Sequence, residues 1–429
     1  MRITNPHPRT TMSFQPLPGF RDFYPDDCAL RNYVFGKWRD AARRYGFREY
    51  DGPPLEPLEL YTVKSGDEIV GQLYNFTDKG ERAVSLRPEL TPTFARMVGA
   101  RQRDYKKPMK WFAIPQLFRY ERQQRGRLRE HFQLNADIVG EKDVAADVEL
   151  VALLVDVLRS FGLTHEDFVV RVSDRRVWGG FLRGMGIADE QHPAVFGIVD
   201  KIERSEATVT QKKFDALGVP VDAASAILKF ADTGMFEKEA PAEMATLQRF
   251  FDLMAHKGLG DFLKFDPKIV RGLAYYTGIV FEAFDKKGEL RAIAGGGRYD
   301  NLLQLVSGVD MPALGFGMGD VVLCELLKER KLLPKLESRL DAYVVIAKEE
   351  LRPQALKLVR DLRDAGLACD YPLVAAKVGK QFESSSAAGA KFAVVIGDEW
   401  AQGQATVKTL ATREETKVEV ARLAQRLKE

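Results

Sequence analysis

Apolar and polar residues follow two different periods along the chain, and these periods separate predicted helices from predicted strands. Over residues 30–45 apolar side chains recur at helical spacing, and Gly46 marks the end of this predicted helix. Two longer strands are predicted at 110–118 and 131–139, and a second helix follows at 145–161. Shorter strands are predicted at 72–76, 83–86 and 168–172.

The second half of the chain changes character twice. From about 187 to 258, charged and apolar residues alternate at helical spacing with few strand signals, which predicts a small helical insertion. Strand patterns return at 279–283 and 291–294, and a helix begins near Gly319. Alternating strands and helices then predict a separate α/β domain over residues 337–429. Its expected elements are strands at 342–346, 392–395 and 406–410, a helix at 353–365 and a C-terminal helix.

The length of the chain, 429 residues, is too great for one compact core. We expect a disordered leader at 1–16 and a core domain at 17–330, followed by the C-terminal domain. Cys28, Cys324 and Cys369 lie far apart and form no CxxC pair. A zinc cluster or a disulfide framework is therefore not expected, and no metal ligand is assigned.

Membrane and export signals are also missing from the pattern. No apolar run approaches the roughly 18 residues of a membrane span, and the first residues contain no apolar signal core. The three scattered cysteines suit a reducing compartment. We therefore expect a cytoplasmic protein that does not act at a membrane.

A strongly basic segment stands out because the whole chain is almost neutral, with 64 Lys and Arg residues against 61 Asp and Glu residues. Residues 101–130 carry ten basic side chains and three acidic ones, and part of this segment joins the two longer predicted strands. Arginine forms paired hydrogen bonds with phosphate, so the cluster suits ATP, an RNA backbone or both. A solvated hairpin tip is the alternative interpretation of such a charge run.

The sequence FRYERQQRGRLREHFQ in this segment resembles motif 2 of the class II aminoacyl-tRNA synthetases, in its histidyl form. Further similarities to this family follow in the same order, at 17–25, 85–91, 270–282 and 294–302. The sequence VGKQFESSSAAGAKFAVVIG resembles the family's anticodon-binding domain. The resemblance implies an α+β fold: a class II antiparallel β-sheet core with helices and a helical insert, and a C-terminal α/β anticodon-binding domain.

The activity that this resemblance implies is that of a histidine–tRNA ligase. L-Histidine would react with ATP, supplied with Mg²⁺, to give histidyl-adenylate. The histidyl group would then pass to the 3′ end of histidine tRNA, with AMP and pyrophosphate as the other products. ATP is a substrate in this scheme, and no tightly bound cofactor is expected. The helix at 30–45 and the following PPLEP resemble motif 1, which implies a homodimer.

The resemblance also implies roles for individual residues. Arg119 and Arg271 would be the catalytic residues, because cations at the α-phosphate of ATP offset the negative charge of the transition state. The ATP-binding residues implied are these two arginines with Glu121, Arg127 and Gly319. The histidine-binding residues implied are Glu89, Thr91, Gln133, Asp137, Tyr275 and Tyr276. The implied contacts to the acceptor end of the tRNA are Gln123, Gln124 and Arg125.

Some of these residues can also be interpreted without the family. Gln133 and Asp137 lie two side-chain periods apart on a predicted strand, so they share a face and can line one pocket. Tyr275 and Tyr276 are equally typical of β-sheet packing. Arg271, beside a glycine, is equally typical of a structural ion pair.

Two glycine-rich segments allow more than one interpretation. Residues 295–297 would let the backbone approach a ligand, or would form a tight turn with Asp300 capping the helix that begins at Asn301. The sequence GFGMG at 315–319 has the spacing GxGxG, which differs from the GxGxxG of a dinucleotide-binding loop.

Two positions depart from the family pattern. Ala274 stands where the histidyl block has an aspartate. In motif 3, Val321 and Val322 occupy the positions of a glutamate and an arginine, and the family's arginine stacks on adenine. We expect Val322 to pack on the purine by dispersion, or Arg122 or Arg127 of the motif 2 loop to compensate.

The main alternative is a catalytically inactive regulatory or histidine-sensing paralogue, which the missing motif 3 arginine favours. Arg119, Arg271 and the C-terminal domain favour the enzyme. Gln133 and Asp137 argue for histidine over another amino acid. The same pocket residues argue against a protein that only binds RNA.

Overall fold

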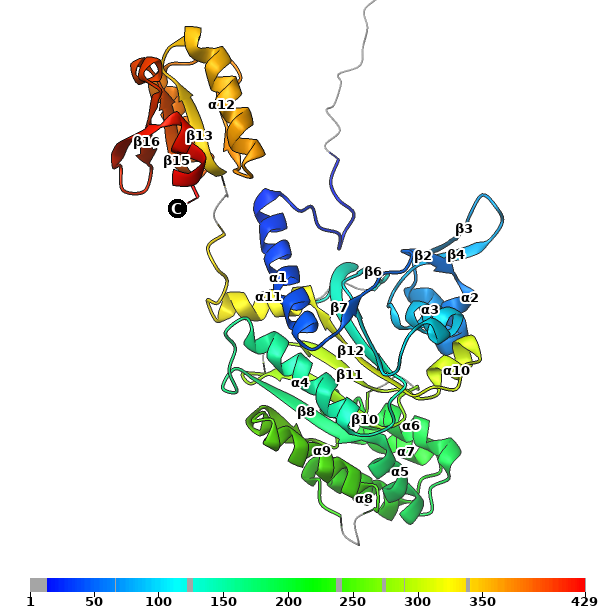
Figure 1. Cartoon of the computed structure of the whole chain (residues 1–429). Coiled ribbons are helices and arrows are strands. Elements are labelled where there is room, and N and C mark those ends of the chain that lie inside the picture. The colour runs from blue at the N-terminus through cyan, green and yellow to red at the C-terminus, as the bar shows by residue number, and fades with distance from the viewer. Residues whose placement is uncertain are drawn as a thin grey trace, which may run out of the picture. The chain divides into compact units, whose positions relative to one another are not determined.

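The computed structural model describes residues 14–65, 67–121, 126–236, 241–271, 275–288, 290–336 and 340–428. The chain divides into two compact units, the first ending at Leu333 and the second beginning at Pro334 (Figure 1). Each unit has its own β-sheet and its own buried apolar cluster. Within the described ranges, no helix combines the length and the apolar character needed to cross a membrane.

A nine-stranded sheet, counted over the described residues, forms the centre of the first unit (Figure 1). Its strands follow the order β1-β5-β7-β12-β11-β10-β8-β9, and β6 pairs with β7 off this path. Their bounds are β1 (Arg48–Glu49), β5 (Met109–Ala113), β6 (Gln116–Phe118), β7 (Glu130–Val139), β8 (Phe168–Asp174), β9 (Leu263–Phe265), β10 (Ile279–Asp285), β11 (Ala294–Arg298) and β12 (Ala313–Gly319). Only the edge pairs β1–β5 and β8–β9 are parallel among these, so the predicted antiparallel core is confirmed.

Three strands differ from their sequence-based predictions. The strand predicted at 110–118 is two strands, because Pro115 has no N–H for the ladder; its carbonyl accepts a hydrogen bond from the Gln133 N–H at 3.1 Å. β11 begins at Ala294, which leaves Arg291 in the connection before it. The pattern does not predict β12 at all, since its sequence ALGFGMG is rich in glycine and glycine weakens a strand signal.

The main apolar core lies against one face of this sheet, and the helices that contribute to it include α1 (Pro25–Arg44), α4 (Ala145–Arg159), α9 (Met244–His256) and α11 (Asp320–Glu329). In Figure 1, α4 lies across the strands with α1 and α9 at either side of it. Trp38 of α1 and Leu154 of α4 are fully buried in one cluster with Leu134 and Ile138 of β7. The helices predicted at 30–45 and 145–161 are therefore confirmed, although α1 begins five residues earlier, at Pro25.

The segment between β8 and β9 is helical over most of its described residues. Its helices are α5 (Arg175–Gly184), α6 (His192–Val199), α7 (Ala207–Ala216), α8 (Val221–Thr233) and α9. Trp178 of α5 and Phe230 of α8 pack edge to face with ring centroids 4.6 Å apart, so α5 and α8 are joined by aromatic contact.

A small antiparallel sheet lies beside the large one and is formed by β2 (Leu55–Pro57), β4 (Ala83–Leu86) and β3 (Asn75–Thr77). The associated helices are α2 (Glu59–Ser65), α3 (Thr91–Arg101) and α10 (Leu302–Ser307). A 3₁₀ helix at Asp67–Gln72 replaces the start of the strand predicted at 72–76. The predicted capping of α10 by Asp300 is wrong: α10 has no side-chain cap, and Asp300 accepts a hydrogen bond from the Thr277 hydroxyl at 3.1 Å.

The described residues of the second unit form a five-stranded sheet with the order β14-β13-β15-β16-β17. The pairs of β13 with β14 and β15 are parallel, and β15, β16 and β17 are antiparallel. The strands are β13 (Leu340–Ile346), β14 (Cys369–Asp370), β15 (Ala390–Ile396), β16 (Gln404–Thr409) and β17 (Glu415–Glu419), and the helices are α12 (Arg352–Asp364), α13 (Val378–Ala387) and α14 (Leu423–Arg426). The predicted α+β fold is confirmed.

Candidate active site

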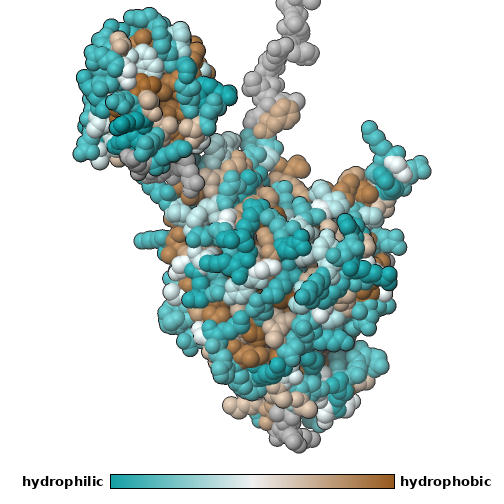
Figure 2. Space-filling model, in the orientation of Figure 1, coloured by the Kyte–Doolittle hydropathy of each residue, from teal (hydrophilic) through white to brown (hydrophobic). Residues whose placement is uncertain are grey.

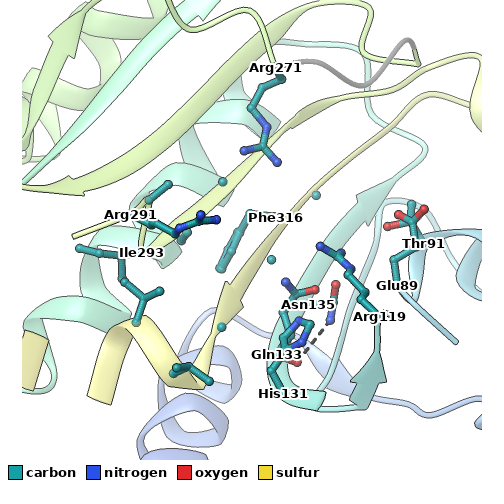
Figure 3. A pocket seen from close by; sticks show the side chains of 18 of the residues that line it. Glu89, Thr91, Arg119, His131, Gln133, Asn135, Arg271, Arg291, Ile293 and Phe316 are labelled. Carbon is teal, nitrogen blue, oxygen red and sulfur yellow. Dashed lines mark hydrogen bonds between the residues drawn. The ribbon is translucent and has the colours of Figure 1, made fainter. Parts of the chain in front are cut away.

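A cavity of about 370 Å³ lies on the large sheet and is lined by residues of β7, β11, β12 and the connections around them (Figure 3). This volume lies within the range of small-molecule sites. Eleven residues that the sequence assigned to ligands line it: Glu89, Thr91, Arg119, Glu121, Arg127, Gln133, Asp137, Arg271, Tyr275, Tyr276 and Gly319. The other residues singled out for this region, Arg122, Gln123, Gln124, Arg125 and Ala274, lie outside the described residues.

Strand β7 separates the cavity from the apolar core. Leu134 and Ile138 point into the core under α4, while the alternating positions Gln133, Asn135 and Asp137 line the cavity. The prediction that Gln133 and Asp137 share one face of a strand is confirmed.

The glycines of β12 allow these polar side chains to lie against the neighbouring strand. A Cβ placed on Gly317 would lie 2.7 Å from Cδ of Gln133, and a Cβ on Gly315 would collide with the Asp137 carboxylate. Gly315 pairs directly with Asp137 across the sheet. The GxGxG sequence is therefore part of a strand that leaves room for polar side chains, which agrees with its exclusion as a dinucleotide-binding loop.

Asp137 is the most perturbed carboxyl group of the cavity. It is 4% exposed, and burial raises its pKa to about 7 even though it accepts a hydrogen bond from the Tyr299 hydroxyl. Burial therefore favours the protonated form of this carboxyl, and a ligand N–H donor would favour its charged form. Tyr299 was not assigned a role from the sequence, although it lies in the segment 294–302 that resembles the family.

Arg119 and Arg271 enter the cavity from different sides (Figure 3). Nε of Arg119 donates a hydrogen bond to the Pro88 carbonyl at 2.9 Å, and this contact holds the guanidinium in position. Arg271 is paired with Glu282, and its guanidinium lies so close to β11 that a Cβ on Gly295 would be 2.9 Å from Cζ of Arg271. Arg271 therefore forms the ion pair that the sequence allowed and also lines the cavity.

The two tyrosines are not part of a strand. Tyr275 and Tyr276 lie between β9 and β10, with ring centroids 4.7 Å apart, and both line the cavity. The interpretation as sheet packing is therefore wrong. Outside a strand, neighbouring side chains do not alternate between opposite faces, so both rings can reach one cavity.

His131 also lines the cavity, although the sequence analysis did not select it. Burial, and then the positive charge of Arg119, lower the pKa of His131 to about 3. The imidazole is therefore neutral at physiological pH and presents a flat, uncharged ring. Its position four residues after Arg127 in the motif 2 segment is the only sequence signal, and that signal gives no measure of burial.

The first turn of α11 presents apolar side chains to the cavity. Val321 and Val322 line it, and Val322 is 8% exposed. The acidic residue before them, Asp320, instead accepts hydrogen bonds from Nη1 of Arg21 at 2.9 Å and from the Phe132 N–H at 3.0 Å. Asp320 is therefore engaged in holding Arg21 and β7, and it does not substitute for the missing motif 3 glutamate.

Comparison with known families decides between the alternatives. The model of the histidyl-tRNA synthetase family matches residues 19–319, and that of the anticodon binding domain matches residues 341–429. The chain belongs to the histidyl-tRNA synthetase family. The family resemblance drawn from the sequence is confirmed, and so is the class II fold that it implied.

Relatives extend over nearly the whole chain. Histidine–tRNA ligase of Opitutus terrae is 47% identical over 420 residues, covering 95% of this chain and 96% of the relative. The chloroplastic/mitochondrial histidine–tRNA ligase of Arabidopsis thaliana is 40% identical, covering 95% of this chain and 85% of the relative. The crystal structure of histidyl-tRNA synthetase from a Nostoc species superposes with a TM-score of 0.79 at 25% identity, covering 97% of this chain and 99% of that one.

The activity of this protein follows from its membership of the family. The chain is an aminoacyl-tRNA ligase that uses ATP and has histidine and tRNA as its substrates. Nothing in the comparisons favours the inactive paralogue that the motif 3 departure suggested. Over the described residues no group of three or more His, Cys, Asp and Glu side chains is arranged to hold a metal ion.

We predict that Gly317→Ala lowers kcat/KM for histidine by at least about tenfold, or about 1.4 kcal/mol, without a comparable loss of stability. The new methyl group would displace the amide of Gln133, which stands 2.8 Å from the position of that methyl. Histidine-dependent ATP–pyrophosphate exchange measures the effect. Gly197→Ala in α6, where a Cβ meets nothing within 4 Å, is the matched control. Equal effects of both substitutions would contradict the proposed crowding.

Proposed function

We propose that this cavity activates L-histidine with ATP and that the residues assigned from the sequence carry out the reaction. A carboxylate oxygen of histidine attacks the α-phosphorus of ATP, the bond to the β-phosphate oxygen breaks, and pyrophosphate leaves. The 3′-terminal hydroxyl of histidine tRNA then attacks the carbonyl of histidyl-adenylate, and AMP leaves. The main support is that two arginines reach into one cavity whose far end is polar and buried (Figure 3).

The amino acid would occupy the end of the cavity formed by α3, β7 and the tyrosines. Glu89, with Thr91 and Gln133, would bind the amino group, because a carboxylate and neutral acceptors suit an ammonium ion. Asp137 would accept the imidazole N–H, with the Tyr275 and Tyr276 rings beside it. A buried polar site of this kind rejects other amino acids, because they would leave its polar groups unpaired.

Arg119 and Arg271 would act at the reacting phosphate. Negative charge accumulates there in the transition state, and cations already held in place stabilise it without further reorganisation. The contacts to Pro88 and Glu282 supply this positioning before ATP binds. Glu121, Arg127 and Gly319 would complete the ATP site. ATP would enter as its Mg²⁺ complex, with the metal carried mainly by phosphate oxygens and water.

The remaining assignments follow the same proposal. Residues 17–330 would be the catalytic domain with an insertion at about 187–258, and residues 337–429 would bind the anticodon. Gln123, Gln124 and Arg125 would approach the acceptor end of the tRNA. The enzyme would act as a homodimer in the cytoplasm.

The decisive experiment for the proposal is histidine-dependent ATP–pyrophosphate exchange by the purified chain. We expect exchange with histidine and none with the other amino acids. Tight histidine binding without any exchange would overturn the proposed chemistry and return the case to a histidine-sensing protein.

Substitution of Arg271 tests the proposed catalytic cation. We predict that Arg271→Ala slows adenylate formation by about 10²–10³-fold, or about 3–4 kcal/mol, because a positioned charge is lost from the transition state. Histidine binding should survive. Stopped-flow activation and calorimetry separate the two effects. Arg249→Ala removes an arginine whose side chain is 56% exposed and serves as the control. Activation by Arg271→Ala within a few-fold of wild type would contradict the assignment.

Substitution of Asp137 tests the proposed recognition of imidazole. We predict that Asp137→Ala weakens histidine binding by at least about tenfold and ATP binding by less than about twofold, since the imidazole N–H would lose its acceptor. Asp137→Asn keeps the shape and should also bind histidine more weakly. Calorimetric titration of both ligands decides, and equal losses for the two ligands would indicate a scaffold role.

Removal of the second unit tests the proposed division of labour. We predict that a chain ending at Leu333 keeps pyrophosphate exchange but charges tRNA at least about tenfold less efficiently, because the first unit has its own core and the second offers a separate surface for the tRNA. Undiminished charging of full-length tRNA by the shortened chain would disprove this role.

A further inference from the structure

The nucleotide end of the cavity contains an arginine that the family motifs do not account for. Arg291 lies in the connection between β10 and β11, and it lines the same cavity as Val321 and Val322. Figure 3 shows its side chain extending into the cavity, below Arg271 and beside Ile293. Its sequence signal is weak, because the residues around it predict only a short strand.

Arg291 and Val322 reach the same place from different elements. A Cβ placed on Gly126 would lie 3.3 Å from Cγ2 of Val322 and 3.9 Å from Cδ of Arg291. The aliphatic stem of Arg291 and the side chain at the motif 3 arginine position therefore lie beside the same point at Gly126. Cδ is bonded to Nε of the guanidinium, so the positive group lies at the same end of the cavity as Val322.

Three other described arginines line the cavity, and each of them contacts an oxygen atom of the protein. Arg127 was expected from the sequence to compensate for the missing motif 3 arginine, but its guanidinium is ion-paired with Glu121. Arg119 and Arg271 are anchored to Pro88 and Glu282. Arg291 instead enters from the β10–β11 connection, and its stem lies beside the same point at Gly126 as Val322.

The surroundings suit a purine and its phosphates. Cδ2 of the neutral His131 ring lies 4.0 Å from the Cβ position of Gly319, so this ring stands over the start of α11. Val322 offers an apolar surface beside it. A guanidinium is planar and charged, so it can stack on a base and also bind phosphate oxygens.

We propose that Arg291 binds ATP in place of the arginine that motif 3 lacks, with its stem beside Val322 and its guanidinium on the nucleotide. This inference rests on the proposed function and adds the residue that completes its ATP site. The same charge is thus delivered from the β10–β11 connection instead of the first turn of α11. Arg291 belongs to the nucleotide end, so it affects ATP and leaves histidine recognition to the residues near β7.

The test compares nucleotide and amino-acid dependence in Arg291 variants of the full chain. We expect Arg291→Ala to raise the ATP KM in pyrophosphate exchange by at least about tenfold, with the histidine KM changed less than about twofold. Arg291→Lys should recover only part of the loss, because lysine keeps the charge without the planar group. Lys287→Ala, in the same connection but away from the cavity, is the matched control for charge.

A second variant restores the arginine from the other element. In the Arg291→Ala background, Val322→Arg should lower the ATP KM again, because the new guanidinium returns to the motif 3 position. Calorimetric titration with ATP reports nucleotide affinity even if exchange is lost. An ATP KM and ATP affinity of Arg291→Ala within threefold of wild type would overturn the proposal. Absence of exchange in wild type would instead count against the proposed activation, while the ATP titrations would still decide the role of Arg291.

Discussion

The two-faced character of strand β7 is the constraint on which the rest of the structure depends. One face carries Leu134 and Ile138 into the core beneath α4, and the other carries Gln133 and Asp137 into the cavity. A slip of one residue in its pairing would bury the polar side chains and expose the apolar ones. Packing of the helical layer and placement of the site are therefore secured by the same strand register.

Preorganisation of charge is the second theme of the site. Arg119, Arg127 and Arg271 are each held by a protein oxygen: a backbone carbonyl for Arg119 and carboxylates for the other two. Such contacts reduce the conformational freedom that ATP binding would otherwise have to remove. The acceptors also moderate the repulsion among several cations in a small volume, which makes a cavity rich in arginine compatible with a stable fold.

Sequence patterns predict those parts of this fold whose signal is local. The helix at 145–161 carries a long apolar run, and the strand at 131–139 alternates apolar and polar residues. The family motifs also select eleven residues that line the cavity. β12 escapes prediction because its glycines remove the side chains that mark a strand. The Asp137–Tyr299 contact and the proximity of Arg291 to Val322 also escape, because they depend on strand pairing between distant segments. The neutral state of His131 follows from burial, which no local pattern reports.

The glycines of β12 also limit how this site can evolve. Any larger residue at Gly315 or Gly317 would take its space from a polar side chain of β7, so a single substitution in β12 removes recognition and adds none. New specificity would have to arise on β7 itself or in the connections around the cavity. We therefore expect the glycine positions of β12 to vary little among related proteins. Variation should occur instead in the segments at the edge of the cavity, such as the one that carries Arg291.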